Sequence, residues 1–239
     1  MTWSIVAYDP ATSAFGVTVA TRAFAVGASC PFVRAGVGAV STQSITNRYL
    51  GPAILDGLAR GLSPAAAIEG ALVGDDGLHL RQVHAIDCRG RSAAWTGKHC
   101  VEWCGDRPGQ NVHITGNMLA GAATLDKTLI AFEANATLPL PERMMLAIEA
   151  GELAGGDKRG RQSAAMIMTT TEDFPDLNIR VDDAAMPLQE LRRLLELWRA
   201  SWPARHAMSP SKARPSVITD IDAIEAGWRA QGLGLQLRR

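Results

Sequence analysis

The amino-acid sequence predicts an α+β fold in which β-sheets are flanked by pairs of helices. Predicted strands come in runs, pairs of predicted helices separate the runs, and single strands do not alternate with single helices. This order favours distinct sheet and helix layers over one parallel sheet. The chain has 239 residues, 47% of them hydrophobic, which is enough for a substantial core in one large domain or two small ones.

The first run of strands begins with a predicted hairpin over residues 3–22. In TWSIVAYD successive side chains alternate between two faces, and PATSAFG supplies a turn before VTVATRAF. A further strand is expected over residues 35–44, where Gly36 and Gly38 indicate the close approach of another backbone.

Two helices are expected next. Residues 49–61 carry apolar side chains at helical spacing, and residues 63–74 begin with Ser63 as N-cap and Pro64 at the first helical position. The same order then recurs, with strands over 80–97 and 109–119, helices near 122–135 and 141–153, and strands over 161–171 and 177–183.

The C-terminal part is expected to be helical with one break. Residues 187–198 present leucines and a tryptophan on one face, residues 203–215 have the Pro, Ser and Lys composition of a linker, and residues 217–231 predict a final helix. We therefore expect a main domain over residues 1–202 and an appendage over 203–239 that packs on this domain or on a partner subunit.

Charge and hydropathy exclude several classes of protein. Lys and Arg number 24, as do Asp and Glu, so nothing favours nucleic acid or an anionic membrane as a partner. No apolar run reaches the roughly 18 residues that span a bilayer, and the first ten residues lack the features of a secretory signal. A cytoplasmic protein is the prediction.

No metal site or other cofactor is expected. Two of the four cysteines, Cys100 and Cys104, lie close together beside His99, but no second pair of ligands completes a four-coordinate zinc site. We interpret the cysteines as reduced and packed like small hydrophobic side chains. The five histidines lack ligand spacing, and the pattern gives no support to a Ser-His-Asp triad.

Five motifs resemble, in order and spacing, an uncharacterised bacterial family, domain of unknown function 1028. They are TWSIVAYDP, GVTVATRAFAVGA, GVGAVSTQ, GNMLAG and AGGDKRGRQSAA, and the resemblance covers residues 2–200. The family is assigned to the N-terminal-nucleophile (Ntn) hydrolase superfamily. The resemblance therefore implies a four-layer αββα sandwich, here with a C-terminal helical extension, and the predicted order of strands and helices is compatible with it.

The resemblance also implies a nucleophile. Ntn hydrolases use the side chain of the first residue, a Thr, Ser or Cys, as nucleophile and its free α-amino group as general base. That amino group titrates at about 7.7–8.0, so it can accept a hydroxyl proton at neutral pH. The matching position is Thr2, whose small side chain would allow removal of Met1, and Asn117 would offer its amide to the oxyanion.

The segment AGGDKRGRQSAAM, residues 154–166, has two interpretations. Structurally, its glycine pair ends the preceding helix, and its cations lie beyond the negative end of the helix dipole. Functionally, the segment would lie at the mouth of the sandwich, where the resemblance places the cleft. There Arg159 and Arg161 would hold a substrate carboxylate, while Asp157 orients one of them or contacts a substrate amine.

Two functions remain open from the sequence. The first is an amidohydrolase acting on a small anionic amide, and its predicted substrate-binding residues are Arg22, Thr42, Gln43, Asp157, Arg159, Arg161 and Ser163. The alternative is a non-catalytic protein that binds a small molecule on the same scaffold. It is favoured because proteasome-type relatives carry an aspartate at the end of the second strand and a lysine shortly beyond, whereas this chain has Thr21 and Arg22 there and no lysine before Lys98.

The C-terminal part also predicts an assembly. The apolar face of residues 188–198, together with Trp202 and Trp228, is better suited to covering a neighbour than to contact with water, so we expect a homodimer. A purely structural dimer is a third alternative, which a concave pocket near residues 2, 22, 117 and 157 would argue against.

Overall fold

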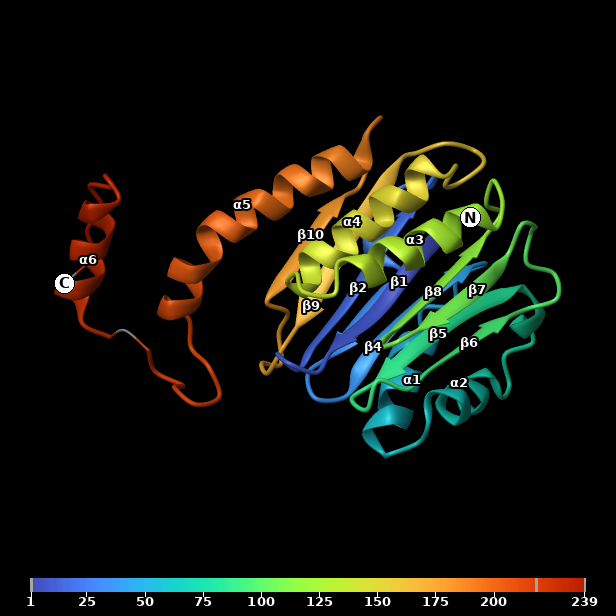
Figure 1. Ribbon diagram of the computed structural model, residues 1–239. Coiled ribbons are helices and arrows are strands. Elements are labelled where there is room, and N and C mark those ends of the chain that lie inside the picture. The colour runs from blue at the N-terminus through green and yellow to red at the C-terminus, as the bar shows by residue number, and fades with distance from the viewer. Residues whose placement is uncertain (1, 218, 239) are drawn as a thin grey trace. The chain divides into compact units, whose positions relative to one another are not determined.

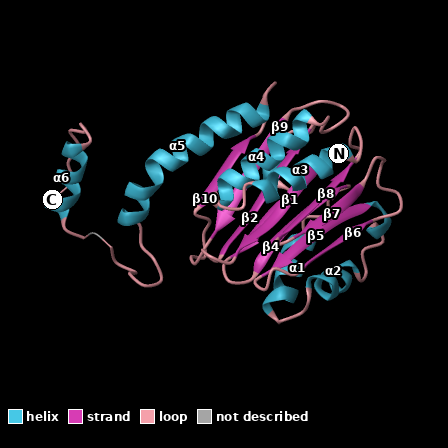
Figure 2. Ribbon diagram, in the orientation of Figure 1, coloured by secondary structure: helices cyan, strands magenta, loops and turns pink. Residues whose placement is uncertain are grey.

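The computed structural model describes residues 2–217 and 219–238 (Figure 1). Contacts divide the chain into two units, Met1–Leu195 and Glu196–Arg239. The first unit holds two antiparallel sheets with helix pairs against them, so the predicted α+β class is confirmed (Figure 2).

The larger sheet has six strands and places the first strand of the chain near its middle. Its order is β10-β9-β2-β1-β8-β7. The predicted hairpin is confirmed, because β1 pairs with β2 antiparallel and Val6 lies opposite Val17. The strands are β1 Thr2–Asp9, β2 Ala14–Thr21, β7 Gly105–Gly109, β8 Val112–Asn117, β9 Ser163–Thr169 and β10 Leu177–Val181.

The smaller sheet has four strands in the order β3-β4-β5-β6. They are β3 Pro31–Arg34, β4 Gly38–Ser44, β5 Arg81–Asp87 and β6 Ser92–Thr96. The sequence did not predict β3 or β7. Both are short, and the GDRPG of β7 has the composition of a turn, yet β7 lies at a sheet edge, where proline is tolerated.

The two sheets face each other, since β1 contacts β4 and β5 contacts β8. Helices α3 Ala123–Ala134 and α4 Leu140–Leu153 lie against the larger sheet, and α1 Leu50–Ala59 and α2 Pro64–Leu72 lie against the smaller one (Figure 1). The Ser63 N-cap predicted for α2 is confirmed, because its hydroxyl accepts a hydrogen bond from the Ala66 amide. One apolar cluster between the sheets contains Val6, Phe15, Val17, Ala39 and Ile86.

The C-terminal helices differ from the expectation in length. Helix α5 runs over Pro187–Met208, so residues 203–208 of the expected linker are helical. Helix α6 covers Ile221–Ala230 and begins with an Asp220 N-cap. In the second unit, Trp198 stacks on Trp202 with ring centroids 5.7 Å apart.

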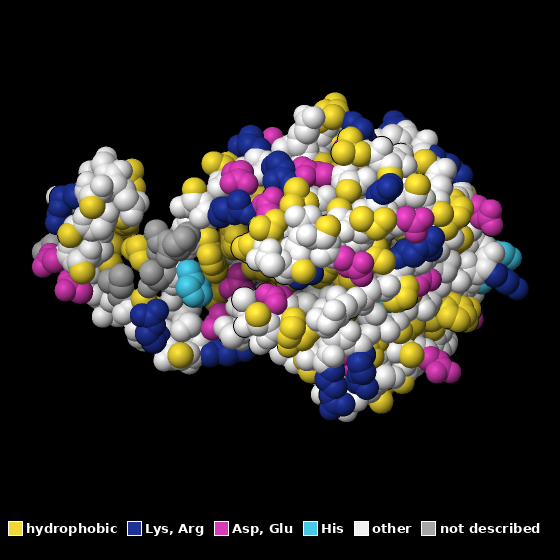
Figure 3. All heavy atoms as spheres, viewed as in Figure 1, with side chains coloured by type: hydrophobic (Ala, Val, Ile, Leu, Met, Phe, Trp, Pro, Cys, Tyr) yellow, Lys and Arg dark blue, Asp and Glu magenta, His cyan; other side chains and the backbone are white. Residues whose placement is uncertain are grey.

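Surface charge is mixed, and Cys88 and the partly exposed Cys104 depart from the packing expected of the four cysteines. On the face seen in Figure 3, basic and acidic side chains are interspersed. Cys30 and Cys100 are buried, as expected for packed thiols, but Cys88 is exposed. Burial raises the pKa of the Cys30 thiol to about 12. Every helix in the described part of the chain is too short or too polar to cross a bilayer.

Candidate functional site

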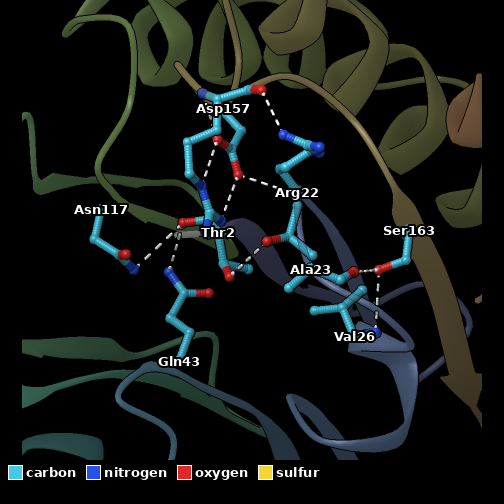
Figure 4. A network of polar contacts seen from close by, with 10 residues as sticks. Thr2, Arg22, Ala23, Val26, Gln43, Asn117, Asp157 and Ser163 are labelled. Atoms are coloured by element: carbon cyan, nitrogen blue, oxygen red, sulfur yellow. Dashed lines mark hydrogen bonds and ion pairs between the residues drawn. The ribbon is translucent and has the colours of Figure 1, made fainter. Parts of the chain in front are cut away.

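Strand ends bring most of the predicted site residues to one end of the larger sheet. Thr2 begins β1 and lies opposite Asn117 at the end of β8, and Thr21 at the end of β2 lies opposite Ser163 at the start of β9. Gln43 of β4 approaches this end from the smaller sheet (Figure 4). Antiparallel pairing in the centre of the sheet therefore gathers residues that are far apart in sequence.

Thr2 is held at both its main chain and its side chain. The Gln43 Nε2 and Asn117 Nδ2 atoms donate to the Thr2 carbonyl oxygen, at 3.3 and 3.5 Å (Figure 4). The Thr2 Oγ1 atom donates to Thr21 Oγ1 at 3.3 Å, and only 5% of Thr2 is exposed. Met1, which the proposed chemistry requires to be removed, lies outside the described residues.

Behind Thr2, a layer of buried side-chain amides and hydroxyls joins the two sheets. Gln82 of β5 is central, because its Oε1 accepts from Gln43 Nε2 at 2.8 Å and from Asn117 Nδ2 at 2.9 Å. Gln43 also donates to Thr115 Oγ1 at 3.1 Å and accepts from Ser4 Oγ at 2.7 Å. Buried polar groups must be paired to avoid a desolvation penalty, and here they pair with each other. No pattern in the sequence had singled out Gln82, Thr115 or Ser4 as site residues.

The polar layer ends in a histidine pair. His84 Nε2 lies 2.8 Å from Ser4 Oγ, and the His84 and His113 rings meet edge to face at 5.9 Å. His113 in turn contacts Asp106 Oδ2 at 3.0 Å. Burial holds the pKa of His84 well below its usual range, and the charge of His113 lowers it further. Ser4 and His84 are fully buried, so this serine–histidine contact is enclosed in the core.

Asp157 ties the charged loop to the end of β2. Its carboxylate accepts from the Arg22 amide at 2.7 Å and from the Arg159 amide at 2.9 Å, and it pairs with the Arg159 guanidinium at 3.1 Å. The Asp157 side chain is fully shielded from solvent, and a bridge with Leu119 adds main-chain contact. Of the two roles expected for Asp157, its contacts fit the orientation of an arginine better than contact with a substrate amine.

The glycine pair before Asp157 has the geometry expected for the end of a helix. Gly155 and Gly156 have φ angles of +120° and +54°, in the region that favours glycine, and α4 ends at Leu153. Lys158 donates to the Glu102 carbonyl oxygen, and Arg22 Nη1 donates to the Arg159 carbonyl oxygen at 3.2 Å. The loop is thus fixed at several points.

Two further predicted residues bond to main chain nearby. Ser163 Oγ donates to the Ala23 carbonyl oxygen at 2.6 Å and accepts from the Val26 amide at 3.1 Å, which holds the turn after β2 (Figure 4). Thr42 Oγ1 donates to the Asn47 carbonyl oxygen at 3.2 Å. In this structure both hydroxyls stabilise loops around the site.

A pocket of about 540 Å³ lies beside the loop. It is on the helix side of the larger sheet, because Trp3, which lines it, packs against Gly151 and Gly156 at the end of α4. Thr2 and Ser4 alternate with Trp3 and face the smaller sheet. The lining of the pocket includes Trp3, Ala20, Thr21, Glu152, Asp157 and Arg161. Thr21, which accepts a hydrogen bond from Thr2, thus also lines the pocket.

Glu152 is a charged pocket residue that no sequence pattern had singled out. It lies in the last turn of α4, directly before the charged segment, and its proximity to that segment was the available signal. Burial raises the pKa of the Glu152 carboxyl, while the charge of Arg161 opposes the shift. Among the described residues, no group of three or more His, Cys, Asp or Glu could hold a metal ion.

Comparison with known proteins identifies relatives but no activity. The model of a family of unknown function, DUF1028, matches residues 2–191. A crystal structure of a DUF1028 protein from Silicibacter pomeroyi is similar, with a TM-score of 0.84 and 28% identity over 92% of this chain and 96% of that one. None of the curated proteins matches.

A more distant likeness is too weak to carry an argument about the fold. Anbu, described as an ancestral beta-subunit, from Yersinia bercovieri, has a TM-score of 0.37 and 11% identity, over 85% of this chain and 97% of that one.

Proposed function

The chain belongs to DUF1028, a family of unknown function, and we propose that it is an amide hydrolase of the N-terminal-nucleophile type, with Thr2 as nucleophile after removal of Met1. The observation that carries the proposal is the anchoring of Thr2. Side-chain amides from both sheets bind its carbonyl oxygen, and its hydroxyl is directed at Thr21. Such anchoring would orient an N-terminal amine and hydroxyl before a substrate arrives.

The proposed reaction needs only groups of the chain and water. The free amine of Thr2 takes the Oγ1 proton as Oγ1 attacks the amide carbonyl carbon, and the protonated amine then gives this proton to the leaving nitrogen as the C–N bond breaks. Water hydrolyses the resulting ester by the same route. Asn117 is the donor we assign to the oxyanion, because its 3.5 Å contact with Thr2 is long enough to be exchanged for a substrate oxygen.

The arrangement of layers supports this proposal. Each sheet carries one helix pair, and the sheets contact each other, which agrees with the four-layer αββα sandwich of Ntn hydrolases. Substrate selection is assigned to the cations at the loop, Arg22, Arg159 and Arg161, whose side chains are partly exposed and would favour a small anionic amide.

Mass spectrometry with a β-lactone probe tests the nucleophile. Protein with Thr2 as its first residue is expected to gain one adduct that maps to Thr2, and Thr2→Ser is expected to keep the reaction. Thr2→Ala is expected to lose it, while Thr137→Ala, which changes an exposed threonine, should label like the parent. Equal labelling of the Thr2→Ala variant would overturn the assignment.

A binding protein without catalysis is the second candidate, and the contacts of Asp157 favour it. Both carboxylate oxygens of Asp157 are used within the loop, and the pocket opens on the helix side of the sheet, away from the Thr2 side chain. If native protein retains Met1 and the probe labels nothing, the binding function replaces the catalytic one.

We also propose that the protein is a homodimer. Leu188, Leu191 and Leu195 are buried within the first unit, so the surface available to a partner is further along α5, where Leu197 is 54% exposed. Light scattering after size-exclusion chromatography is expected to give twice the chain mass. A monomer at micromolar concentration would contradict the proposal.

A further inference from the structure

Two charged side chains in the pocket beside the loop are only partly paired. Glu152 is 14% exposed, and its Oε1 atom is buried without a hydrogen bond. Within residues 2–217 and 219–238, its one charged partner is Arg161, whose Nε lies 3.3 Å from Oε1. A carboxylate so far removed from water is costly unless several donors compensate it, so Glu152 has capacity for a further donor.

Arg161 lacks strong hydrogen-bond acceptors, just as Glu152 lacks donors. Its Nη1 atom contacts the thioether of Met186 at 3.2 Å, which is a weak acceptor. In the described part of the chain, Nη2 takes part in no hydrogen bond. The guanidinium is 39% exposed, so its two terminal nitrogens remain available to a planar, bidentate acceptor such as a carboxylate.

We propose that this pocket binds the free α-amino acid group of a small ligand, with Glu152 contacting its ammonium and Arg161 its carboxylate. In an α-amino acid only two bonds, N–Cα and Cα–C, separate the ammonium nitrogen from the carboxylate carbon. This short separation matches Glu152 and Arg161, whose charged groups lie side by side. Trp3, Ala20 and Pro187 give the pocket an apolar wall beside its polar and charged residues, and an apolar ligand side chain can pack there.

Ligands that carry only one of the two charges fit the pocket less well. A ligand with a carboxylate but no ammonium would lie against Glu152 and meet like-charge repulsion, while an amine without a carboxylate would leave the guanidinium unpaired. Lys158 also lines the pocket, where its ammonium group keeps its charge and donates to the Glu102 carbonyl oxygen. The pair of opposite charges therefore selects a zwitterion.

This inference does not depend on Thr2 acting as a nucleophile. The pocket reaches Thr21, the hydrogen-bond partner of Thr2, but opens on the other side of the sheet from the Thr2 side chain, so its ligand is distinct from the anionic amide of the proposed reaction. Binding and labelling are measured separately, and either can fail without the other. Thr2→Ala is expected to lose the β-lactone adduct and to keep amino acid binding.

Isothermal titration of the full chain with the twenty free L-amino acids tests the proposal, beginning with L-leucine. At least one is expected to bind with a Kd of about 1 mM or lower. The N-acetyl and the amide derivatives of the best ligand each lack one charge and should bind at least about tenfold more weakly. Binding of none at about 10 mM, or equal binding of the N-acetyl derivative, would overturn it.

Substitutions assign the two contacts. Glu152→Gln is nearly isosteric and is expected to weaken binding about tenfold, as is Arg161→Met. Glu133→Gln changes an exposed glutamate of α3 and is expected to leave binding unchanged. Arg161→Lys retains the charge without the fork and should fall between the parent and Arg161→Met. Circular dichroism confirms folding of each variant, and unchanged binding in folded Glu152→Gln or Arg161→Met would refute the assignment.

Discussion

The space between the two sheets has an apolar end and a polar end. Away from Thr2 it is filled by the cluster around Val6, Phe15 and Ile86. Next to Thr2, strands β1, β4, β5 and β8 contribute Ser4, Gln43, Gln82, His84, Thr115 and Asn117, all nearly or fully buried. Burial of apolar area stabilises the first end directly. The hydrogen bonds of the polar end add little net free energy of folding, but breaking any one of them leaves a buried polar group unpaired, which is costly. The polar layer is therefore better explained by the positioning of Thr2 than by stability.

The largest effect is expected at the apolar end. Phe15 is fully buried and stacks on Tyr8 with ring centroids 4.7 Å apart, so Phe15→Ala should lower the free energy of unfolding by about 3–5 kcal/mol. Urea denaturation measures the loss. Labelling at Thr2 should persist under native conditions, and loss of labelling in folded protein would show that the two ends are not independent.

Removal of the central acceptor tests the polar end. Gln82→Leu leaves the amide groups of Gln43 and Asn117 without the oxygen that binds both, so the free energy of unfolding should fall by about 2–4 kcal/mol. Gln110→Leu, at an exposed position, should change it by less than about 0.5 kcal/mol. Equal effects of the two substitutions would contradict the described network.

Acid should weaken the polar end selectively. The folded-state pKa of His84 is depressed, with the charge of His113 contributing, so His84 binds a proton more readily when unfolded. Its contribution to stability is present above the unfolded pKa of about 6.5 and is lost as pH falls below it. Between about pH 7.5 and 5.5 the free energy of unfolding of the parent should fall more than that of His84→Gln, by on the order of 1 kcal/mol. Parallel pH profiles in urea denaturation would disprove this.

The smallest effect is expected for a single peripheral hydroxyl. Thr115→Val keeps the shape of the side chain but removes one of several acceptors of Gln43 Nε2, and it should cost about 0.5–1.5 kcal/mol. Combined with Gln82→Leu in a double-mutant cycle, it should give a coupling energy different from zero, because both side chains contact Gln43. Simple additivity would mean that the layer does not act as a network.

Local sequence patterns were sufficient to predict the strands and helices that have a clear alternation or capping signal. Alternation identified the β1–β2 hairpin, and Ser63 with Pro64 identified the start of α2. The strand β7 escaped prediction because its glycine and proline composition is typical of turns, and only its position at a sheet edge allows it to pair.

The site was harder to predict because its contacts are long range. The bond from the Arg22 amide to Asp157 and the bonds of Gln82 to Gln43 and Asn117 depend on which strands are neighbours. Nothing local to Gln82 distinguishes it from a solvated glutamine. Thr2, Gln43 and Asn117 were predicted separately, as nucleophile, substrate contact and oxyanion donor, and the structure brings these three into contact.

The central place of β1 and β2 in the larger sheet has a consequence for synthesis. Both strands emerge first, but β8 and β9, which cover their free edges, follow about a hundred residues or more later. At about 5–20 residues per second, the apolar hairpin waits on the order of ten seconds with both edges unpaired. Pulse-labelled nascent chains stalled before β8 should therefore be held by chaperones, and chains released after β9 should not.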